Sequence, residues 1–208
     1  RQMCIRDRSK VDGTILYPGE EFDLAKTVSP FTQENGYELA GAYQNGTVVE
    51  SFGGGICQVA TTLYNAVIRA ELEITMRFNH SMLVHYVEPS MDAAIAGNYK
   101  DLKFKNNLDA PVYIEGYCSG GIIYFNVYGK ETRPSNREIS FESETVSKTD
   151  PKVQFTMDAS LTAGSVSVTQ SGQSGCIAQL WKIVKVDGKQ QSRDCLLYTS
   201  PSPRDAHE

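Results

Sequence analysis

The chain of 208 residues has no apolar segment long enough to span a membrane and no run of basic residues. Its formal net charge is −5, and nucleic-acid recognition depends on cations that neutralise phosphates, so we exclude a nucleic-acid-binding protein. Histidine is scarce, with three residues, and neither C-x-x-C nor H-E-x-x-H spacing occurs. The sequence therefore predicts no metal ion and no other cofactor.

The two ends of the chain resemble translated transposon adapter from a sequencing library. The letters MCIRD (3–7) and CLLYT (195–199) can be encoded by the two complementary strands of one DNA segment. We therefore exclude residues 1–8 and 195–208 from the interpretation, as a fusion scar would be excluded. The remaining 186 residues carry 16 Lys and Arg against 22 Asp and Glu, and we interpret them as an internal fragment of a longer protein.

Outside the excluded ends only three cysteines remain, Cys57, Cys118 and Cys176, and this odd number predicts no disulfide framework. The redox compartment stays open, because few unpaired cysteines fit both a cytosolic protein and an exported protein of a Gram-positive cell or an anaerobe. Cys118 and Cys176 have no nearby partners of the right type. We interpret both as structural residues.

One helix is predicted among several strands, which indicates an α+β domain over residues 9–130. The helix covers Gln58 to Leu72. A polar, proline-containing linker is predicted at 131–137, followed by a small all-β unit at 138–194. Strands are predicted in GTILYPGEEFDL (13–24), ENGYELAGAYQNGTVVE (34–50), SMLVHYV (81–87), KDLKFKNN (100–107), APVYIEGYC (110–118), GIIYFNVYG (121–129), REISFESETVSK (137–148), VQFTMDASL (153–161), GSVSVTQSGQSG (164–175) and CIAQLWKIVKVDGKQ (176–190).

Cys57 follows three consecutive glycines and Ile56, and it stands directly before the predicted helix, at its first turn. At about 100° per residue around the helix axis, Cys57 falls nearly opposite the apolar face of the helix. The apolar face comprises Val59, Leu63, Ala66, Val67 and Ala70, and the side of Cys57 comprises Thr61, Tyr64 and Ile68. The thiol is therefore predicted to lie off the core, in a first turn whose dipole stabilises a thiolate.

The glycine turn adds a second feature that acyl transfer requires. Gly54 and Gly55 permit close approach of a substrate, with backbone N–H groups that can bind an oxyanion. The glycine turn and the helix start by themselves allow three roles for Cys57: an acyl-transfer nucleophile, a structural cysteine and a metal ligand. The missing metal-ligand spacing disfavours the third role.

A thiolate nucleophile usually needs a histidine, and only His80 and His85 lie outside the excluded ends. In a strand over 81–87 they would point to opposite faces, so only one could share a site with Cys57. We expect His80 to be the general base, with a surface or capping role as the alternative, and a structural role is favoured for His85. The remaining candidate site residues are Asp92, His85 and Tyr86 for orienting the imidazole, and Gln58, Thr61, Thr62, Ser81 and Tyr86 for binding substrate.

Several segments occur in the order and at the separations typical of one family, the VanW domain, which the chain resembles from Val11 to Gly129. From Glu131 the chain resembles a G5 domain that is cut off at the excluded end, with LTAGSVSVTQSGQSG and VKVDGKQ as its glycine-bearing segments. The segments that carry the VanW resemblance are YPGEEFD, ENGYELAGAYQNG, GGGICQVATTLYNAVIRAELEI, RFNHSM, HYVEPSMDAA and YKDLKFKNN.

This resemblance implies an extracellular, cell-wall-associated protein of a Gram-positive bacterium, held by a membrane anchor in the missing N-terminal part. It implies one main helix that carries the cysteine at its N-terminus, packed on antiparallel strands. The implied partners are peptidoglycan stem peptides and glycan, with the G5 domain as a wall-binding or spacer module.

Some VanW-domain proteins of clostridia are understood to be L,D-transpeptidases that form 3-3 peptidoglycan cross-links, or L,D-carboxypeptidases if water replaces the acceptor. Carried onto this sequence, the resemblance implies that Cys57 is the nucleophile and that His80 and Ser81 are the family's His-Ser pair. Family members do not generally require a histidine at position 85. The alternative is a non-catalytic wall-binding accessory protein linked to glycopeptide resistance, whose helix N-terminus binds a stem-peptide carboxylate.

Overall fold

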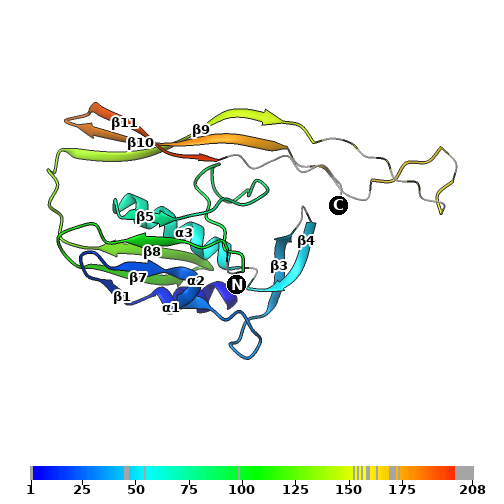
Figure 1. The fold of residues 1–208 in the computed structure, drawn as a ribbon, viewed down its shortest axis with the longest axis horizontal. Coiled ribbons are helices and arrows are strands. Elements are labelled where there is room, and N and C mark those ends of the chain that lie inside the picture. Colours follow the sequence, from blue (N-terminus) through cyan, green and yellow to red (C-terminus); the bar gives the residue numbers. More distant parts are fainter. Residues whose placement is uncertain are drawn as a thin grey trace.

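The computed structural model describes residues 2–44, 47–53, 55–97, 99–151, 153, 155, 157, 160–162, 164–168, 172 and 174–199. Within these ranges the chain forms a first part of helices and short antiparallel strands, followed by a sheet of long strands after residue 137 (Figure 1). This mixture confirms the predicted α+β class. No helix of the described ranges is long and apolar enough to cross a membrane.

Antiparallel pairs form every sheet of the first part, in the strand orders β1–β7–β8, β2–β6–β5 and β3–β4. These strands confirm five of the predicted strand segments of this part. The Asn-Gly sequence at residues 45 and 46, which is typical of a hairpin turn, lies outside the described residues. The strands are β1 (Thr14–Leu16), β2 (Glu21–Asp23), β3 (Leu39–Gln44), β4 (Thr47–Phe52), β5 (Glu73–Met76), β6 (Lys103–Lys105), β7 (Val112–Ser119) and β8 (Ile122–Tyr128).

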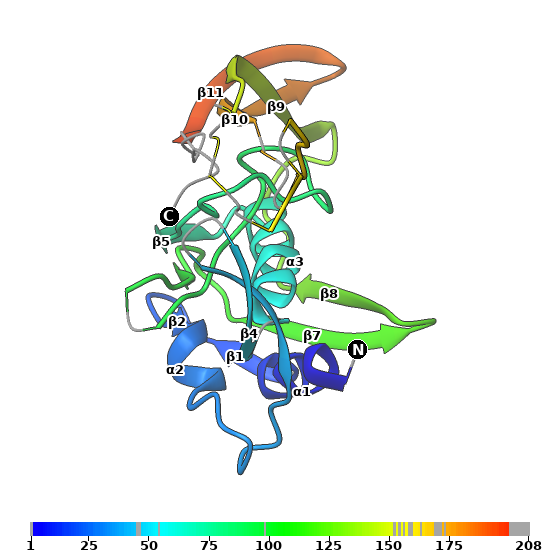
Figure 2. The ribbon, with the colours of Figure 1, turned by 90° about the vertical axis from the view of Figure 1, so that its right-hand side faces the viewer.

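Helix α3 (Ile56–Arg69) is buried on nearly all sides. It packs against β8, as Figure 2 shows, and its predicted apolar face joins the core through residues such as Leu63. The opposite face was expected to lie outside the core, but Thr61 and Tyr64 on that face are also buried. The reason is that residues 91–95 cross this side of the helix and bond to it. Cys57 is half-buried beside them.

The prediction of a strand at 81–87 is wrong, because these residues form bends and irregular backbone. They belong to the long connection between β5 and β6, which covers α3 instead of extending a sheet. A strand needs a neighbour that accepts its backbone hydrogen bonds, and β6 already has β2 on one side and β5 on the other. The strand-parity argument that separated His80 from His85 therefore does not apply.

Two further helices were not predicted. Helix α1 (Gln2–Val11) lies mostly in the segment that resembles adapter sequence. Helix α2 (Leu24–Val28) is little more than one turn, which is too short to produce a periodic pattern. Asp23 caps it by accepting a hydrogen bond from the N–H of Lys26 over 2.8 Å.

The second part is a three-stranded antiparallel sheet in the order β11–β10–β9, with β9 (Arg137–Thr149), β10 (Gly175–Val186) and β11 (Lys189–Thr199). Its last strand includes residues 195–199 of the segment that resembles adapter sequence. The strands predicted at 153–161 and 164–175 are absent among the described residues of these segments, except that Gly175 begins β10.

Glu71 connects the two parts through an ion cluster. It follows α3 in a left-handed backbone conformation, with φ of 61°, and contacts three cations. Arg137 donates to both carboxylate oxygens over 2.7 Å, and Arg133 and Lys182 complete the cluster. The hydrogen bonds from Arg137, followed by those from Lys182 and Arg133, outweigh burial and hold the pKa of Glu71 well below its usual range.

We predict that Glu71→Gln lowers the free energy of unfolding by about 1–3 kcal/mol at neutral pH, because charge-assisted hydrogen bonds to three cations are weakened. A carboxylate with a lowered pKa stabilises the fold above its ordinary value of 4.5, and this stability is lost as the pH falls. The wild type should therefore approach the variant in stability on acidification. Urea unfolding at several pH values measures both effects.

Glu131→Gln is the matched control, because Glu131 also pairs with Arg133 but its side chain is 62% exposed, against 12% for Glu71. An exposed pair contributes little, so this variant should unfold within about 0.5 kcal/mol of the wild type. Equal stability of Glu71→Gln and Glu131→Gln would contradict the role assigned to the cluster.

Candidate active site

Cys57 lies in the first turn of α3, one residue after the helix begins at Ile56. The N-cap residue is Gly55, which provides no side-chain hydrogen bond to that turn. The thiol is half-buried, and its Sγ lies 3.6 Å from the carbonyl oxygen of Ile95. Gly54, a candidate for oxyanion binding, lies outside the described residues. The start of the helix thus places the thiol against the connection that leads to β6.

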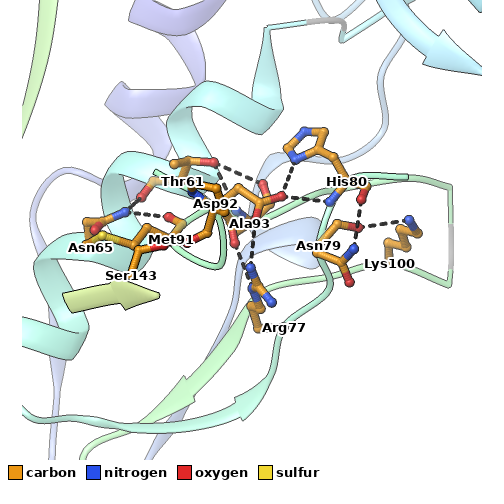
Figure 3. Close-up of polar contacts among 11 residues, drawn as sticks. Thr61, Asn65, Arg77, Asn79, His80, Met91, Asp92, Ala93, Lys100 and Ser143 are labelled. Carbon is orange, nitrogen blue, oxygen red and sulfur yellow. Dashed lines mark hydrogen bonds and ion pairs between the residues drawn. The ribbon is translucent and has the colours of Figure 1, made fainter. Parts of the chain in front are cut away.

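His80 is buried, and Asp92 holds both its ring and its backbone (Figure 3). The Nδ1 atom of His80 lies 2.7 Å from Oδ2 of Asp92, and the backbone N–H of His80 donates to the same oxygen over 2.7 Å. One carboxylate oxygen therefore fixes the chain and the imidazole together. Because Nδ1 faces Asp92, Nε2 is the ring nitrogen left for a second partner.

Arg77 holds Asp92 through a buried ion pair. Its Nη2 donates to Oδ1 of Asp92 over 2.7 Å, and its Nε donates to the Asp92 carbonyl oxygen over 2.6 Å. The guanidinium also lies over the ring of Tyr64 from α3, 5.6 Å from the ring centroid. Both oxygens of the Asp92 side chain thus accept hydrogen bonds, as a buried carboxylate requires.

These contacts determine the charges of the site. Burial is the largest influence on Asp92 and acts against its charge, but the hydrogen bonds from His80 and the charge of Arg77 outweigh it and lower its pKa. Burial likewise opposes the charged form of His80, but hydrogen bonds with Asp92 and Cys57 raise the pKa of His80 to about 9. At neutral pH the imidazole is therefore protonated and lies beside the thiol.

Two polar side chains of α3 attach the helix to the segment that carries Asp92. The hydroxyl of Thr61 accepts from the N–H of Ala93 over 3.0 Å and donates to the Ala93 carbonyl oxygen over 3.3 Å. Asn65 donates to the carbonyl oxygen of Met91 over 2.7 Å (Figure 3). Because Cys57 and Thr61 are on the same helix, these bonds set the position of the thiol relative to Asp92 and His80.

The first strand of the second sheet also touches this segment. The Ser143 hydroxyl on β9 donates to the carbonyl oxygen of Pro89 over 2.5 Å, three residues before Asp92. The guanidinium of Arg69, at the end of α3, lies 5.7 Å from the ring centroid of Phe141 on the same strand. The connection that carries the site is therefore enclosed between α3 and β9.

The structure brings Cys57, His80 and Asp92 together, but it places the candidate substrate-binding residue Thr61 differently from expectation. Thr61 is buried and its hydroxyl is engaged with Ala93, so it cannot line a donor site. The hydroxyl of Thr62 donates to the carbonyl oxygen of Gln58 over 2.7 Å, within its own helix.

The other candidates lie at the start of α3 or on the connection between β5 and β6. Gln58 and His85 are exposed, and Ser81 is half-buried. The ring of Tyr86 lies edge-on to the imidazole of His80, with 6.3 Å between the centroids. Tyr86 therefore lies next to the imidazole, and its role as an orienting or substrate-binding residue stays a prediction.

Sequence reasoning missed Arg77, Asn65 and Lys100. Lys100 donates to the carbonyl oxygen of Asn79 over 3.0 Å, and Asn79 donates to the His80 carbonyl oxygen over 2.8 Å, so both restrain the chain at the histidine. Arg77 stands three residues before His80, within the quoted segment RFNHSM, and its charge in an otherwise uncharged run was the available signal. Within the described ranges, no group of three or more His, Cys, Asp and Glu could hold a metal ion.

Comparison with known proteins gives two family matches. A family model described as VanW like protein matches residues 5–128, and one described as G5 domain matches residues 141–202. The matches include residues 5–8 and 195–202 of the segments that resemble adapter sequence.

Two curated proteins are similar to the first part of the chain. The chain is 36% identical over 121 residues to the uncharacterized protein YoaR of Bacillus subtilis (strain 168), which covers 58% of the chain and 40% of YoaR. It is 27% identical over 110 residues to the vancomycin B-type resistance protein VanW of Enterococcus faecalis (strain ATCC 700802 / V583), which covers 50% of the chain and 40% of that protein. The aligned part is thus well under two thirds of either relative, and no solved structure matches the chain.

We predict that the stability of the protein falls by up to about 3 kcal/mol as the pH rises from about 6.5 to 9. A histidine whose pKa is raised from 6.5 to about 9 stabilises the fold fully below 6.5, and this contribution is lost as the pH rises through 9. Urea unfolding measured across this range should show the decline in the wild type and a flatter profile in His80→Gln.

His85→Gln serves as the control, because His85 is exposed. It should keep the pH dependence of the wild type. Asp92→Asn should flatten the profile, since it removes the carboxylate that keeps the imidazole charged. A wild-type profile unchanged by both His80→Gln and Asp92→Asn would refute the assigned contacts.

Proposed function

The chain belongs to the VanW family, and from this premise we propose that it is a cell-wall cysteine acyltransferase acting on tetrapeptide stems of peptidoglycan. The observation that carries the proposal is the arrangement of a helix-start thiol, a protonated imidazole and a buried carboxylate at Cys57, His80 and Asp92. A nucleophile beside a base that a third group orients is the arrangement of covalent acyl transfer.

The first half of the reaction forms a thioester. The Cys57 thiol first loses its proton to solvent, because the protonated His80 cannot accept it. The resulting thiolate attacks the carbonyl carbon of the third stem residue, and the tetrahedral oxyanion is bound by backbone N–H groups at the start of α3. The C–N bond to the terminal D-alanine then breaks. The imidazolium of His80 gives its proton to the leaving amine, so D-alanine departs with a neutral amino group and His80 becomes neutral.

The second half releases the acyl group. The side-chain amine of the third residue in a neighbouring stem attacks the thioester, and the neutral imidazole of His80 accepts the proton that this amine loses. The C–S bond breaks, which restores the thiolate and the imidazolium and leaves a 3-3 cross-link. With water as the acceptor, the same steps yield a shortened stem and an L,D-carboxypeptidase.

The charges of the site support this order of proton transfers. His80 holds a proton at neutral pH, so the acid needed for the leaving amine is present before the attack. Asp92 stays ionised and keeps Nδ1 in place, which leaves Nε2 as the nitrogen that exchanges protons with substrate. Arg77 acts through Asp92 and is a positioning residue.

The comparisons support a place at the cell wall. One relative is named for vancomycin resistance, and the chain carries a G5 domain after the VanW domain. We therefore propose an extracellular, wall-associated protein linked to glycopeptide resistance, with the G5 domain as a wall-binding or spacer module.

We predict that incubation with disaccharide-tetrapeptide gives an acyl adduct on Cys57 with loss of one alanine, detected by mass spectrometry of the intact protein. Cys57→Ala should form no adduct and no cross-linked or shortened product. His80→Gln should slow turnover by roughly 10²–10⁴-fold, because it lacks the acid and base.

Cys118→Ala and His85→Gln are the matched controls and should react at the wild-type rate. Turnover by Cys57→Ala equal to that of the wild type would refute the proposed mechanism. Binding of the stem peptide without any adduct or product, in the wild type and Cys57→Ala alike, would instead identify the non-catalytic wall-binding accessory protein.

A further inference from the structure

One face of the β1–β7–β8 sheet is exposed and strongly aromatic. Strand alternation sends one set of side chains toward the core and the other outward. The inner set includes Ile114 and Phe125, which are buried. The outer set, here named the tyrosine face, consists of Ile15, Tyr113, Glu115, Tyr117, Ser119, Ile122, Tyr124, Asn126 and Tyr128.

The four tyrosines form two cross-strand pairs. Tyr117 lies opposite Tyr124, with ring centroids 4.9 Å apart and planes inclined by 10°. Tyr113 lies opposite Tyr128, with centroids 6.2 Å apart and planes inclined by 32°. Each of the four tyrosines remains 38% to 52% exposed, so aromatic surface is open to solvent in both pairs.

A hydrogen-bonded polar row separates the two pairs. Oε2 of Glu115 accepts a hydrogen bond from the side chain of Asn126 over 2.9 Å and another from the hydroxyl of Tyr128 over 2.9 Å. The tyrosine pairs stand four residues apart along β7, about 13 Å at the rise of a strand. A ligand that contacts both pairs must therefore be an extended chain with polar groups between its apolar faces.

We propose that the tyrosine face binds the glycan strand of peptidoglycan. The polarised C–H groups on a pyranose ring are attracted to the negative face of an aromatic ring, and an oligosaccharide presents such faces at intervals. The carboxylate, amide and phenol groups between the pairs match the hydroxyl and acetamido groups of the sugars in donors and acceptors.

The charge of the face favours a glycan over a polyanion. Strands β1, β7 and β8 contain no Lys, Arg or His, and Glu115 is their one acidic residue. A phosphate-bearing polymer would meet a carboxylate and no cation, which is unfavourable. A neutral polyol meets no such penalty.

The same carboxylate disfavours a second copy of the chain as the occupant. Glu115 lies in the middle of the face, so a two-fold pairing of two tyrosine faces would bring two carboxylates together away from water. The choice of peptidoglycan as the source of the glycan rests on the proposed function, whereas binding itself requires no chemistry at Cys57.

Calorimetric titration of the full chain with peptide-free glycan strands released from purified peptidoglycan tests this proposal. Cys57→Ala should bind as the wild type does, so that a failure of catalysis and a failure of glycan binding are separate results. The double variant Tyr117→Ala/Tyr124→Ala should bind at least about tenfold more weakly, because two stacking rings are lost.

Tyr99→Ala is the matched control, because Tyr99 is 70% exposed and lies outside the tyrosine face. It should bind glycan as the wild type does, and circular dichroism should show both variants folded. Longer strands should bind more tightly than disaccharides, since only they reach both tyrosine pairs.

Three results would overturn the proposal. The first is no heat of binding at millimolar glycan. The second is equal affinity for the wild type and the double tyrosine variant. The third is a wild-type dimer in analytical ultracentrifugation that the double variant abolishes, which would assign the face to a second copy.

Discussion

The candidate site depends on the carboxylate of Asp92, which holds His80 twice through one oxygen, at the ring and at the backbone N–H. This interaction is possible only because Arg77 satisfies the second oxygen, so that a charge can be buried beside α3. The imidazole is consequently both oriented and kept protonated. The irregular connection between β5 and β6 therefore has one defined conformation at His80.

Helix α3 relates this connection to the rest of the molecule. Its first turn carries Cys57, its middle binds the Met91–Ile95 segment through Thr61 and Asn65, and its C-terminal end leads to Glu71. Glu71 in turn contacts cations from the linker and from β10, while Ser143 on β9 bonds to the connection itself. The second sheet is therefore attached at both the helix end and the site segment, so its packing bears on the geometry around His80.

Sequence reasoning succeeded where local patterns determine structure. The apolar period of α3 predicted the helix within three residues of its observed ends. Turn signals located the hairpins β3–β4 and β7–β8 and the successive strands β1 and β2, which join different sheets. It failed at 81–87, where alternating apolar residues predicted a strand, because strand formation requires a pairing partner. It also predicted that Thr61 would line a substrate site on an exposed helix face. The position of a residue around the helix does not show that the 91–95 segment covers this face.

The sequence by itself determined which residues were available: one cysteine at a helix start after three glycines, two histidines outside the terminal segments, and two tyrosines four residues apart in each of two segments. Only the tertiary structure decided their partners. The β5–β6 connection has no periodic sequence pattern and is held by hydrogen bonds from side chains to its backbone. The donors are Arg77, Asn65 and Lys100, which no sequence pattern identified as part of the site. The two tyrosine pairs depend on the register between β7 and β8. The Glu71 cluster depends on contact between segments that are distant in the sequence. No local sequence pattern relates the residues that these contacts join.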